Sequence, residues 1–417
     1  MTKPLKLALG TLSLLGGAAG AQTVTMATHY PAENVAVLEP CFAQYRDETG
    51  VEVVHQQIPY GDYLQTILTA RLGGQSPDIY HVYSIWAAQL VDNGLLAVPP
   101  EEVLGFVTDN YVGSTVYAIT IDDQTWGVPT EVANYLLVYN KQIFAEAGID
   151  APPATWDELL EIAAATTERD AQGRATQVGY ADYYPSVAGV VHRYLTSLYS
   201  KGVDLFNEDF TATNLGTPEA LEALEERVAL FEAGSADLSV DSDAFVAGDV
   251  AMTIQASWQE GEYREVFGDA FEDTVGIASI PMGDDWRSLQ YAFFYGVDAN
   301  SDVQDESWAF IEWLNSQASA QAEGGPSCMG EMLVGLGALT ANNADIEAAD
   351  ADLGDFFTAP FSEALERSIT EPNVIQASEI ETILQTYLVQ AYGGDLEPEA
   401  ALAQADEEIT AILAEFY

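Results

Sequence analysis

One stretch of the chain, Ile119–Leu159, constrains the fold more than any other. Within it, Tyr135–Tyr139 is an unbroken run of apolar and aromatic residues, which predicts a strand buried on both faces. Lys141–Ala147 then predicts a short helix that ends at Gly148, because glycine suits the left-handed conformation that follows many helices. The stretch alternates strand with helix, which is typical of a lobe of the α/β class.

A second helix is expected soon afterwards. Pro152 and Pro153 prevent the first helix from continuing. Thr155 is predicted to be an N-cap, since Glu158 follows three residues later in the spacing of a capping box. Trp156 begins the apolar stripe of this helix and is therefore expected in the core.

The order of these motifs resembles the signature region of family 1 extracellular solute-binding proteins, the capture subunits of ABC importers for sugars and related polyols. In that family a "dG..yGvP" strand precedes a "YNK..F..aGl" helix and a "PP.TWdEL" helix start. The matching residues are Asp123, Trp126, Gly127, Val128, Pro129, Tyr139, Asn140, Lys141, Phe144, Gly148, Pro152, Pro153, Thr155, Trp156, Asp157, Glu158 and Leu159. The resemblance implies an α/β fold of the two-lobe periplasmic-binding-protein type (type II-like). Each lobe would be a mixed sheet flanked by helices, and crossover hinge strands would join the lobes.

A second stretch, Phe245–Gly261, resembles the "F..GkaAM...g.W" motif of the same family. The matching residues are Phe245, Gly248, Asp249, Ala251, Met252 and Trp258. Gln290–Val297 then stands where the chain of that family crosses back to the first lobe. The resemblance covers nearly the whole chain beyond residue 21.

The first residues have the features of a secretory signal peptide. Lys3 and Lys6 precede an apolar run, Leu7–Leu15, and the small residues at 19–21 suit cleavage before Gln22. The run is shorter than the roughly 20 apolar residues that span a membrane, and no cysteine stands at the cleavage site to carry a lipid. We expect a protein exported across the cytoplasmic membrane, periplasmic or otherwise extracytoplasmic.

The length beyond the signal peptide, residues 1–21, exceeds what a single hydrophobic core usually organises, so two lobes are expected. The first lobe is predicted to comprise 22–131, with 293–330 returning to it. The second is predicted to comprise 132–292, with most of 331–417 returning to it.

The charge balance is strongly acidic. The chain holds 66 acidic and 13 basic residues, a formal net charge of −53. Such a chain repels itself at low salt, and molar salt screens that repulsion. We therefore infer a saline external medium for this halophilic composition, and we exclude nucleic acid and anionic membrane surfaces as partners.

Two cysteines, Cys41 and Cys328, leave two alternatives open. Export favours a disulfide, whereas apolar surroundings would suit two unpaired thiols. The four histidines show no metal-binding spacing, so no metal and no cofactor is expected. They are His29, His55, His81 and His192.

Candidate ligand-binding residues follow predicted strands, because open α/β sheets bind ligands beyond the carboxyl ends of their strands. Sugars present apolar ring faces edged by hydroxyls, so a sugar site needs aromatic platforms and planar polar groups. The residues that fall where the family's sites fall are Trp258, Trp86, Ser84, Glu131, Asn134, Tyr183, Tyr184, Tyr291, Phe294 and Tyr30. Trp258 is favoured as a platform. His29 and Tyr30, in the loop after the first predicted strand, are weaker candidates, and packing in the core is the alternative for each ring.

The function implied by the resemblance is capture of a carbohydrate or polyol by hinge closure, with delivery to an ABC permease by a monomeric protein. A polyamine, a phosphorylated polyol or ferric ion remains an alternative ligand. A secreted glycoside-acting enzyme is the alternative of another class, but the sequence contains no G-x-S-x-G, P-loop or H-E-x-x-H motif, and no carboxylate pair stands out. We therefore expect a binding protein and not an enzyme.

Overall fold

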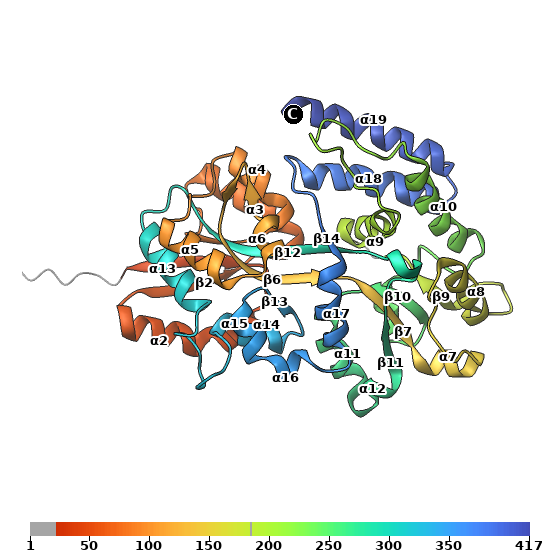
Figure 1. The fold of residues 1–417 in the computed structure, drawn as a ribbon, viewed down its shortest axis with the longest axis horizontal. Coiled ribbons are helices and arrows are strands. Elements are labelled where there is room, and N and C mark those ends of the chain that lie inside the picture. Colours follow the sequence, from red (N-terminus) through yellow and green to blue (C-terminus); the bar gives the residue numbers. More distant parts are fainter. Residues whose placement is uncertain (1–21, 184–185) are drawn as a thin grey trace, which may run out of the picture.

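The computed structural model describes residues 22–183 and 186–417 and contains two mixed β-sheets, each flanked by helices (Figure 1). The expected signal peptide and one candidate residue, Tyr184, lie outside the described residues. In the part of the chain that is described, no helix is both long enough and apolar enough to cross a membrane.

The first sheet has seven strands in the order β13-β6-β12-β3-β1-β2, and β14 pairs with β12 outside this path. β1 pairs in parallel with β2 and β3, whereas β12 runs antiparallel to β3 and β6. Its strands are β1 (Thr23–Thr28), β2 (Glu52–Gln57), β3 (Ile79–Tyr83), β6 (Val128–Asn134), β12 (Ser288–Val297), β13 (Leu339–Thr340) and β14 (Ser368–Thr370).

The second sheet has five strands in the order β11-β7-β10-β9-β8. β10 is parallel to β9 and antiparallel to β7. The strands are β7 (Leu136–Asn140), β8 (Glu168–Arg169), β9 (Ala175–Ala181), β10 (Val250–Gln255) and β11 (Val275–Ala278). A separate two-stranded ribbon consists of β4 (Thr120–Ile121) and β5 (Gln124–Thr125).

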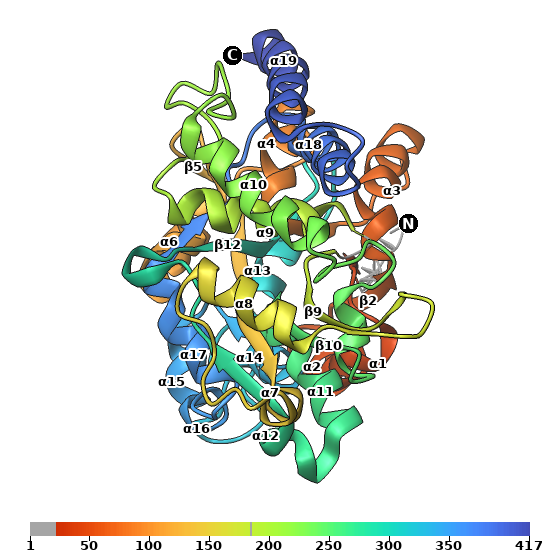
Figure 2. The ribbon, with the colours of Figure 1, turned by 90° about the vertical axis from the view of Figure 1, so that its right-hand side faces the viewer.

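Helices cover both sheets, and a further helical layer of α9, α10, α18 and α19 lies at one end of the molecule (Figure 2). The helices that lie between or next to strands of the seven-stranded sheet in the sequence are α1 (Ala32–Val35), α2 (Glu39–Thr49), α3 (Tyr60–Gly73), α4 (Ala87–Asp92), α5 (Glu101–Asn110), α6 (Gly113–Ala118), α13 (Gln304–Leu314), α14 (Cys328–Gly335) and α15 (Asn343–Ala348). The remaining helices are α7 (Lys141–Ala147), α8 (Trp156–Thr166), α9 (Val187–Ser200), α10 (Pro218–Glu232), α11 (Glu260–Phe267), α12 (Phe271–Thr274), α16 (Asp350–Leu353), α17 (Thr358–Ala364), α18 (Ala377–Tyr392) and α19 (Pro398–Phe416).

The signature stretch folds as its residues predict. α7 has the predicted bounds, and Gly148 follows it with a φ of 71° in the left-handed region. The Thr155 side chain accepts a hydrogen bond from the Glu158 backbone N–H and so caps α8. Trp156 is buried, as expected from its place on the apolar stripe.

The chain crosses between the sheets at two neighbouring points. Tyr135 is the one residue between β6, in the seven-stranded sheet, and β7, in the five-stranded sheet. The chain returns between β11 and β12, and Ser288 at the start of β12 holds the two crossings together. Its hydroxyl oxygen accepts a hydrogen bond from the Tyr135 N–H and donates one to the Tyr135 carbonyl, both at 2.8 Å. A hinge between two lobes would bend at these two crossings. The residue bounds of the lobes stay a prediction.

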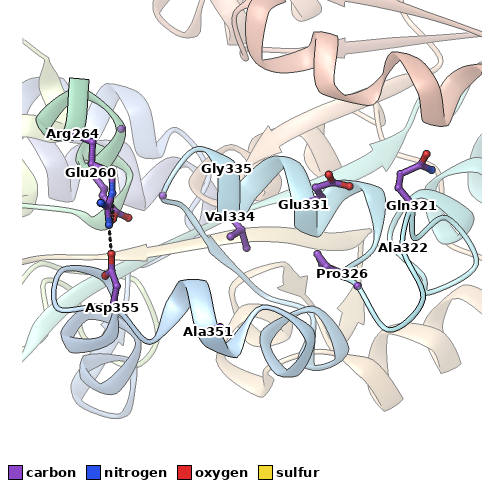
Figure 3. Close-up of a pocket in the computed structure, with 13 residues that line it drawn as sticks. Glu260, Arg264, Gln321, Ala322, Pro326, Glu331, Val334, Gly335, Ala351 and Asp355 are labelled. Carbon is purple, nitrogen blue, oxygen red and sulfur yellow. Dashed lines mark hydrogen bonds and ion pairs between the residues drawn. The ribbon is translucent and has the colours of Figure 1, made fainter. Parts of the chain in front are cut away.

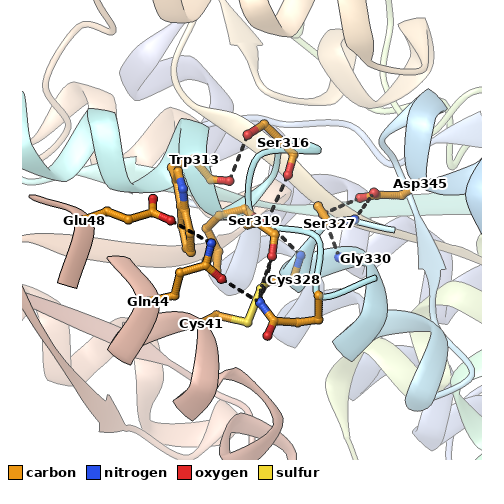
Figure 4. The surroundings of a disulfide bond; sticks show 12 residues. Cys41, Gln44, Glu48, Trp313, Ser316, Ser319, Ser327, Cys328, Gly330 and Asp345 are labelled. Atoms are coloured by element: carbon orange, nitrogen blue, oxygen red, sulfur yellow. Dashed lines mark hydrogen bonds between the residues drawn. A yellow bond between two sulfur atoms is a disulfide. The ribbon is translucent and has the colours of Figure 1, made fainter. Parts of the chain in front are cut away.

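Cys41 and Cys328 form a disulfide between α2 and α14, with their Cα atoms 6.5 Å apart (Figure 4). Of the two alternatives that the sequence left open, the bridge is therefore confirmed. Both cysteines are buried in the core on one side of the seven-stranded sheet, and Ser319 Oγ accepts a hydrogen bond from the Cys328 N–H at 2.9 Å. A bridge that closes a loop this long contributes about 2–4 kcal/mol, mainly by restricting the unfolded chain.

Candidate ligand-binding site between the two sheets

Aromatic rings gather beyond the carboxyl ends of β1 and β3, on the side of the seven-stranded sheet. We call this group the aromatic bed; its members are His29, Tyr30, Tyr60, Tyr83, Trp86 and Phe293. The ring centroids of His29 and Phe293 lie 4.7 Å apart, and those of Tyr83 and Phe293 lie 5.1 Å apart. Neighbouring rings are in contact throughout, so the bed is a continuous apolar cluster that can support an exposed ring against the face of a sugar.

Within the bed, Trp86 is a packed residue and Tyr60 is an exposed one. Trp86 lies buried between two tyrosine rings, 5.5 Å from Tyr60 and 5.7 Å from Tyr63, and nearly parallel to the second. Tyr60, the first residue of α3, keeps 39% of its surface exposed. Tyr60 is therefore the ring of the bed that is open to a ligand, and Trp86 supports it from behind.

Trp258 faces the site from the other sheet. It lies in the short 3-10 turn Ser257–Gln259 directly after β10, and 37% of its surface is exposed. Its indole N–H donates a hydrogen bond to Tyr291 Oη at 2.8 Å. The Tyr291 ring in turn lies 5.6 Å from Tyr83 and 6.2 Å from Phe293. A row of contacting rings therefore joins the aromatic bed to an exposed tryptophan on the second sheet.

A buried carboxyl group adds the polar element of the site. Glu131, in β6, accepts a short hydrogen bond from the hydroxyl of Tyr30. Burial raises the pKa of Glu131 to about 7, although the hydrogen bond from Tyr30 acts in the opposite direction. Near neutral pH this carboxyl can therefore accept hydrogen bonds as a carboxylate or donate one as an acid.

The other predicted residues lie further from this row. The Ser84 hydroxyl accepts a hydrogen bond from the Ala292 N–H, and Tyr183 is half-buried against the core. The Asn134 side chain is buried and donates to the Phe361 carbonyl at 3.0 Å and to Ser368 Oγ at 3.1 Å. Asn134 thus holds the segment that leads to β14.

Phe294 is fully buried on the face of β12 opposite the bed, where its ring lies against Gly127. The ring that joins the bed is Phe293, one position earlier. Alternation along a strand could have identified it, since Tyr291 and Phe293 must share one face and Phe294 the other. The same rule that points to Trp86 after β3 could have found Tyr60, which begins α3 three residues after the end of β2.

A cavity of about 900 Å³ lies between elements of the two halves of the molecule (Figure 3). On one side are Glu260, Gly261 and Arg264 of α11, which begins two residues after Trp258. On the other side are the loop 321–326 and α14, which the disulfide ties to α2. Sequence reasoning predicted none of the lining residues.

Charged groups at one end of this cavity are paired. Arg264 bridges Glu260, at 2.5 Å, and Asp355. Thr358 Oγ1 also donates to Glu260 Oε2 at 2.8 Å. Burial raises the pKa of Glu260, and its neighbour Asp355 adds to that effect. One guanidinium faces two carboxyl groups, so this wall is polar and can form hydrogen bonds with a ligand that offers hydroxyl groups.

Comparison with known proteins supports this fold. A protein of Brucella abortus (strain 2308), whose name states only that it is a binding protein, is 26% identical over 97% of this chain and 96% of its own length. The diacetylchitobiose binding protein DasA of Streptomyces coelicolor is 25% identical over 84% of this chain and 80% of its own.

Among solved structures, the GacH receptor of Streptomyces glaucescens GLA.O, determined without ligand and with acarbose, matches with a TM-score of 0.80. The two sequences are 20% identical, and the match covers 95% of this chain and 100% of the GacH chain. The two-lobe α/β fold with mixed sheets that the sequence predicted is confirmed. The sequence model of the bacterial extracellular solute-binding proteins matches residues 30–321, and the chain belongs to that family.

Proposed function

We propose that this protein captures a carbohydrate or polyol between the aromatic bed and Trp258, outside the cytoplasmic membrane, and delivers it as a monomer to the permease of an ABC importer. The observation that carries this proposal is the exposed indole of Trp258, which a hydrogen bond to Tyr291 links to the aromatic bed and its exposed ring, Tyr60.

A carbohydrate suits this arrangement because it offers an apolar C–H face to an aromatic ring and hydroxyls to the polar groups around it. Glu131 can serve either as acceptor or as donor for such a hydroxyl. The adjacent cavity of about 900 Å³ lies within the usual size of small-molecule sites, roughly 300–1,000 Å³. The names of DasA and of the acarbose-bound receptor, both relatives in fold, agree with a carbohydrate ligand.

Capture would work by hinge closure. The strands cross between the sheets at Tyr135 and Ser288, so a small change of backbone angles there moves one lobe against the other. A ligand that contacts both lobes binds the closed state more tightly than the open state, and it shifts the population towards closure. The permease would then receive the closed, loaded form.

We propose no catalytic step. The carboxyl groups nearest the site have structural partners, Tyr30 for Glu131 and Arg264 for Glu260, and the family consists of binding proteins. A glycoside-acting enzyme would instead need two carboxyls placed on either side of a scissile bond.

Thermal unfolding against a ligand panel tests the function. The panel holds monosaccharides, oligosaccharides, polyols, polyamines, a phosphorylated polyol and ferric ion. One carbohydrate or polyol is expected to raise the unfolding midpoint, because a ligand at 100 times its dissociation constant stabilises the native state by about 2.7 kcal/mol. A rise with a polyamine, a phosphorylated polyol or iron alone would replace the proposed ligand class, and turnover of a glycoside would favour the enzyme.

The variant Trp258→Ala locates the site in the same assay, and Phe416→Ala is its matched control. Phe416 belongs to α19 and is 38% exposed, nearly as much as Trp258. At equal ligand concentration the stabilisation by ligand should fall to about a third in Trp258→Ala and persist in full in Phe416→Ala. Equal stabilisation in the two variants would remove Trp258 from the site.

A further inference from the structure

A buried polar cluster lies beside the crossing point of the strands, behind the aromatic bed. It consists of His192 from α9, Glu371 from the segment after β14, Glu381 from α18 and the hydroxyl of Tyr83 at the end of β3. From His192 Nε2 the distance to Glu371 Oε1 is 2.9 Å, to Tyr83 Oη 3.2 Å and to Glu381 Oε1 3.6 Å. All four side chains are buried.

One oxygen of this cluster has no hydrogen-bond partner among the described residues. It is Glu381 Oε1, which is buried and points towards His192. Two carboxyl groups are thus held together away from water, with one imidazole between them. Burying carboxylates without full compensation is costly, so such groups are paired, protonated or bound to a cation.

Three donor atoms lie close enough together to share one ion. In a tetrahedral zinc site, bonds of about 2.0–2.2 Å place neighbouring donor atoms roughly 3.3–3.5 Å apart. His192 Nε2 lies 2.9 Å from Glu371 Oε1 and 3.6 Å from Glu381 Oε1, and the donor atoms of the three residues all lie within 4.8 Å of one another. One imidazole nitrogen and two carboxylate oxygens are ligands that zinc accepts, and the two carboxylates balance the charge of a divalent ion.

We propose that His192, Glu371 and Glu381 bind a divalent transition-metal ion, zinc by the character of its donors, in a closed structural site behind the aromatic bed, where Tyr83 holds Glu371 in place. The donors come from α9, α18 and the segment after β14, so the ion ties the helical layer to the seven-stranded sheet next to the crossing strands.

The surroundings of the cluster support a metal-bound imidazole. A histidine that binds a metal through one nitrogen usually donates the N–H of the other to an oxygen, which fixes the ring. His192 Nδ1 lies 2.7 Å from Tyr135 Oη, the partner that this role requires. Tyr83 also donates to Glu371 Oε2 and so orients that carboxylate.

Metal analysis of the full chain tests the proposal. The protein is stripped of metal with a chelator and reloaded with zinc in molar sodium chloride and excess magnesium, which occupy the exposed carboxylates. It is then desalted, and its zinc content is measured by elemental mass spectrometry. We expect about one zinc per chain and a higher unfolding midpoint than in the stripped protein. A chain that retains no zinc and whose midpoint does not change would overturn the proposal and leave a metal-free ion cluster.

Glu381→Gln and His192→Gln should weaken zinc binding at least tenfold, since each removes one ligand. The matched control is Glu379→Gln, which changes an exposed carboxyl two positions away on α18 and should bind as the unmodified chain does. Equal zinc binding in all three variants would assign the ion to another place and contradict the site.

Cobalt loading of the unmodified chain gives a reading that does not depend on how the variants fold. Four-coordinate cobalt absorbs visible light far more strongly than six-coordinate cobalt on surface carboxylates. A strong visible band that zinc abolishes supports the closed site, and a weak band alone contradicts it. This test is independent of the carbohydrate, so its failure leaves the proposed function untouched.

Discussion

The two sides of the candidate site present aromatic rings in different ways. On the seven-stranded side the rings support one another: Trp86 is buried between Tyr60 and Tyr63. On the five-stranded side Trp258 keeps 37% of its surface exposed and is oriented by one hydrogen bond to Tyr291. Aromatic residues at a binding site therefore need not share one role. Substitutions of the packed Trp86 should act on stability, and substitutions of the exposed rings, Tyr60 and Trp258, should act on binding.

The largest expected effect is on the buried side. Trp86→Ala should lower the free energy of unfolding by about 3–5 kcal/mol, because it removes a large side chain from a packed position. Trp258→Ala should lower it by less, about 1–2 kcal/mol, since 37% of its surface is already exposed in the folded chain. Denaturant unfolding of the two variants measures both values. Equal losses would show that the two sides do not differ as described.

The next effect concerns pH. Because the folded pKa of Glu131, about 7, lies above its ordinary value of 4.5, the folded chain holds this proton more tightly than the unfolded chain does between these pH values. Wild-type stability should therefore fall as pH rises through this window, by roughly 2–3 kcal/mol. Glu131→Gln lacks this titration, so its stability relative to wild type should rise from pH 5 to pH 8.

Tyr30→Phe sharpens the same prediction. The Tyr30 hydroxyl donates a hydrogen bond to Glu131 and lowers the pKa of that carboxyl. Loss of the hydroxyl should therefore move the pH range in which stability falls to higher values. Unfolding curves at a series of pH values measure the shift. A difference between Glu131→Gln and wild type that stays constant across this range would contradict the raised pKa.

A smaller effect is expected at Tyr291. Tyr291→Phe keeps the ring in its row but removes the acceptor for the Trp258 N–H, so ligand binding should weaken by about 1 kcal/mol, roughly fivefold. Tyr199→Phe is a suitable control, because it also removes a buried tyrosine hydroxyl, for which the described residues provide no partner. Calorimetric titration of both variants gives the comparison; equal affinities would mean that other contacts orient Trp258.

Salt should have the smallest effect for each charged group, and it should act alike on the seven-stranded and the five-stranded sides of the molecule. The net charge of −53 predicts that the unfolding midpoint rises from low to molar sodium chloride, because screening relieves repulsion among the carboxylates. Calorimetric scans in a salt series check this. A flat or falling midpoint would indicate that bound cations already compensate the charge and would argue against a saline medium.

Local features of the fold could be predicted from the sequence, because they depend on neighbours along the chain. The end of α7 at Gly148 and the cap of α8 at Thr155 are such features. Contacts between distant segments could not be predicted in this way. His192 and Glu371 are 179 positions apart, and nothing in either neighbourhood indicates that they meet.

The same difference between local and distant contacts explains in part why only some residues of the candidate site were predicted. Trp258 and Glu131 follow or belong to strands, and the family motifs mark their positions. Tyr60 was missed although it follows β2 by three residues, since the strand-end rule was applied to β1 and β3 but not to β2. Phe294 was chosen where strand alternation gives the neighbouring Phe293 the place in the bed.

The central claim is that one ligand is held between the two sides. Calorimetric titration of Trp258→Ala and Tyr60→Ala with the carbohydrate that stabilises the wild type tests it most directly. We predict that Trp258→Ala weakens binding by about 2 kcal/mol, roughly thirtyfold, that Tyr60→Ala weakens it at least tenfold, and that both variants keep the wild-type circular dichroism spectrum. Wild-type affinity in either variant would contradict the claim, because the ligand would then contact one side alone.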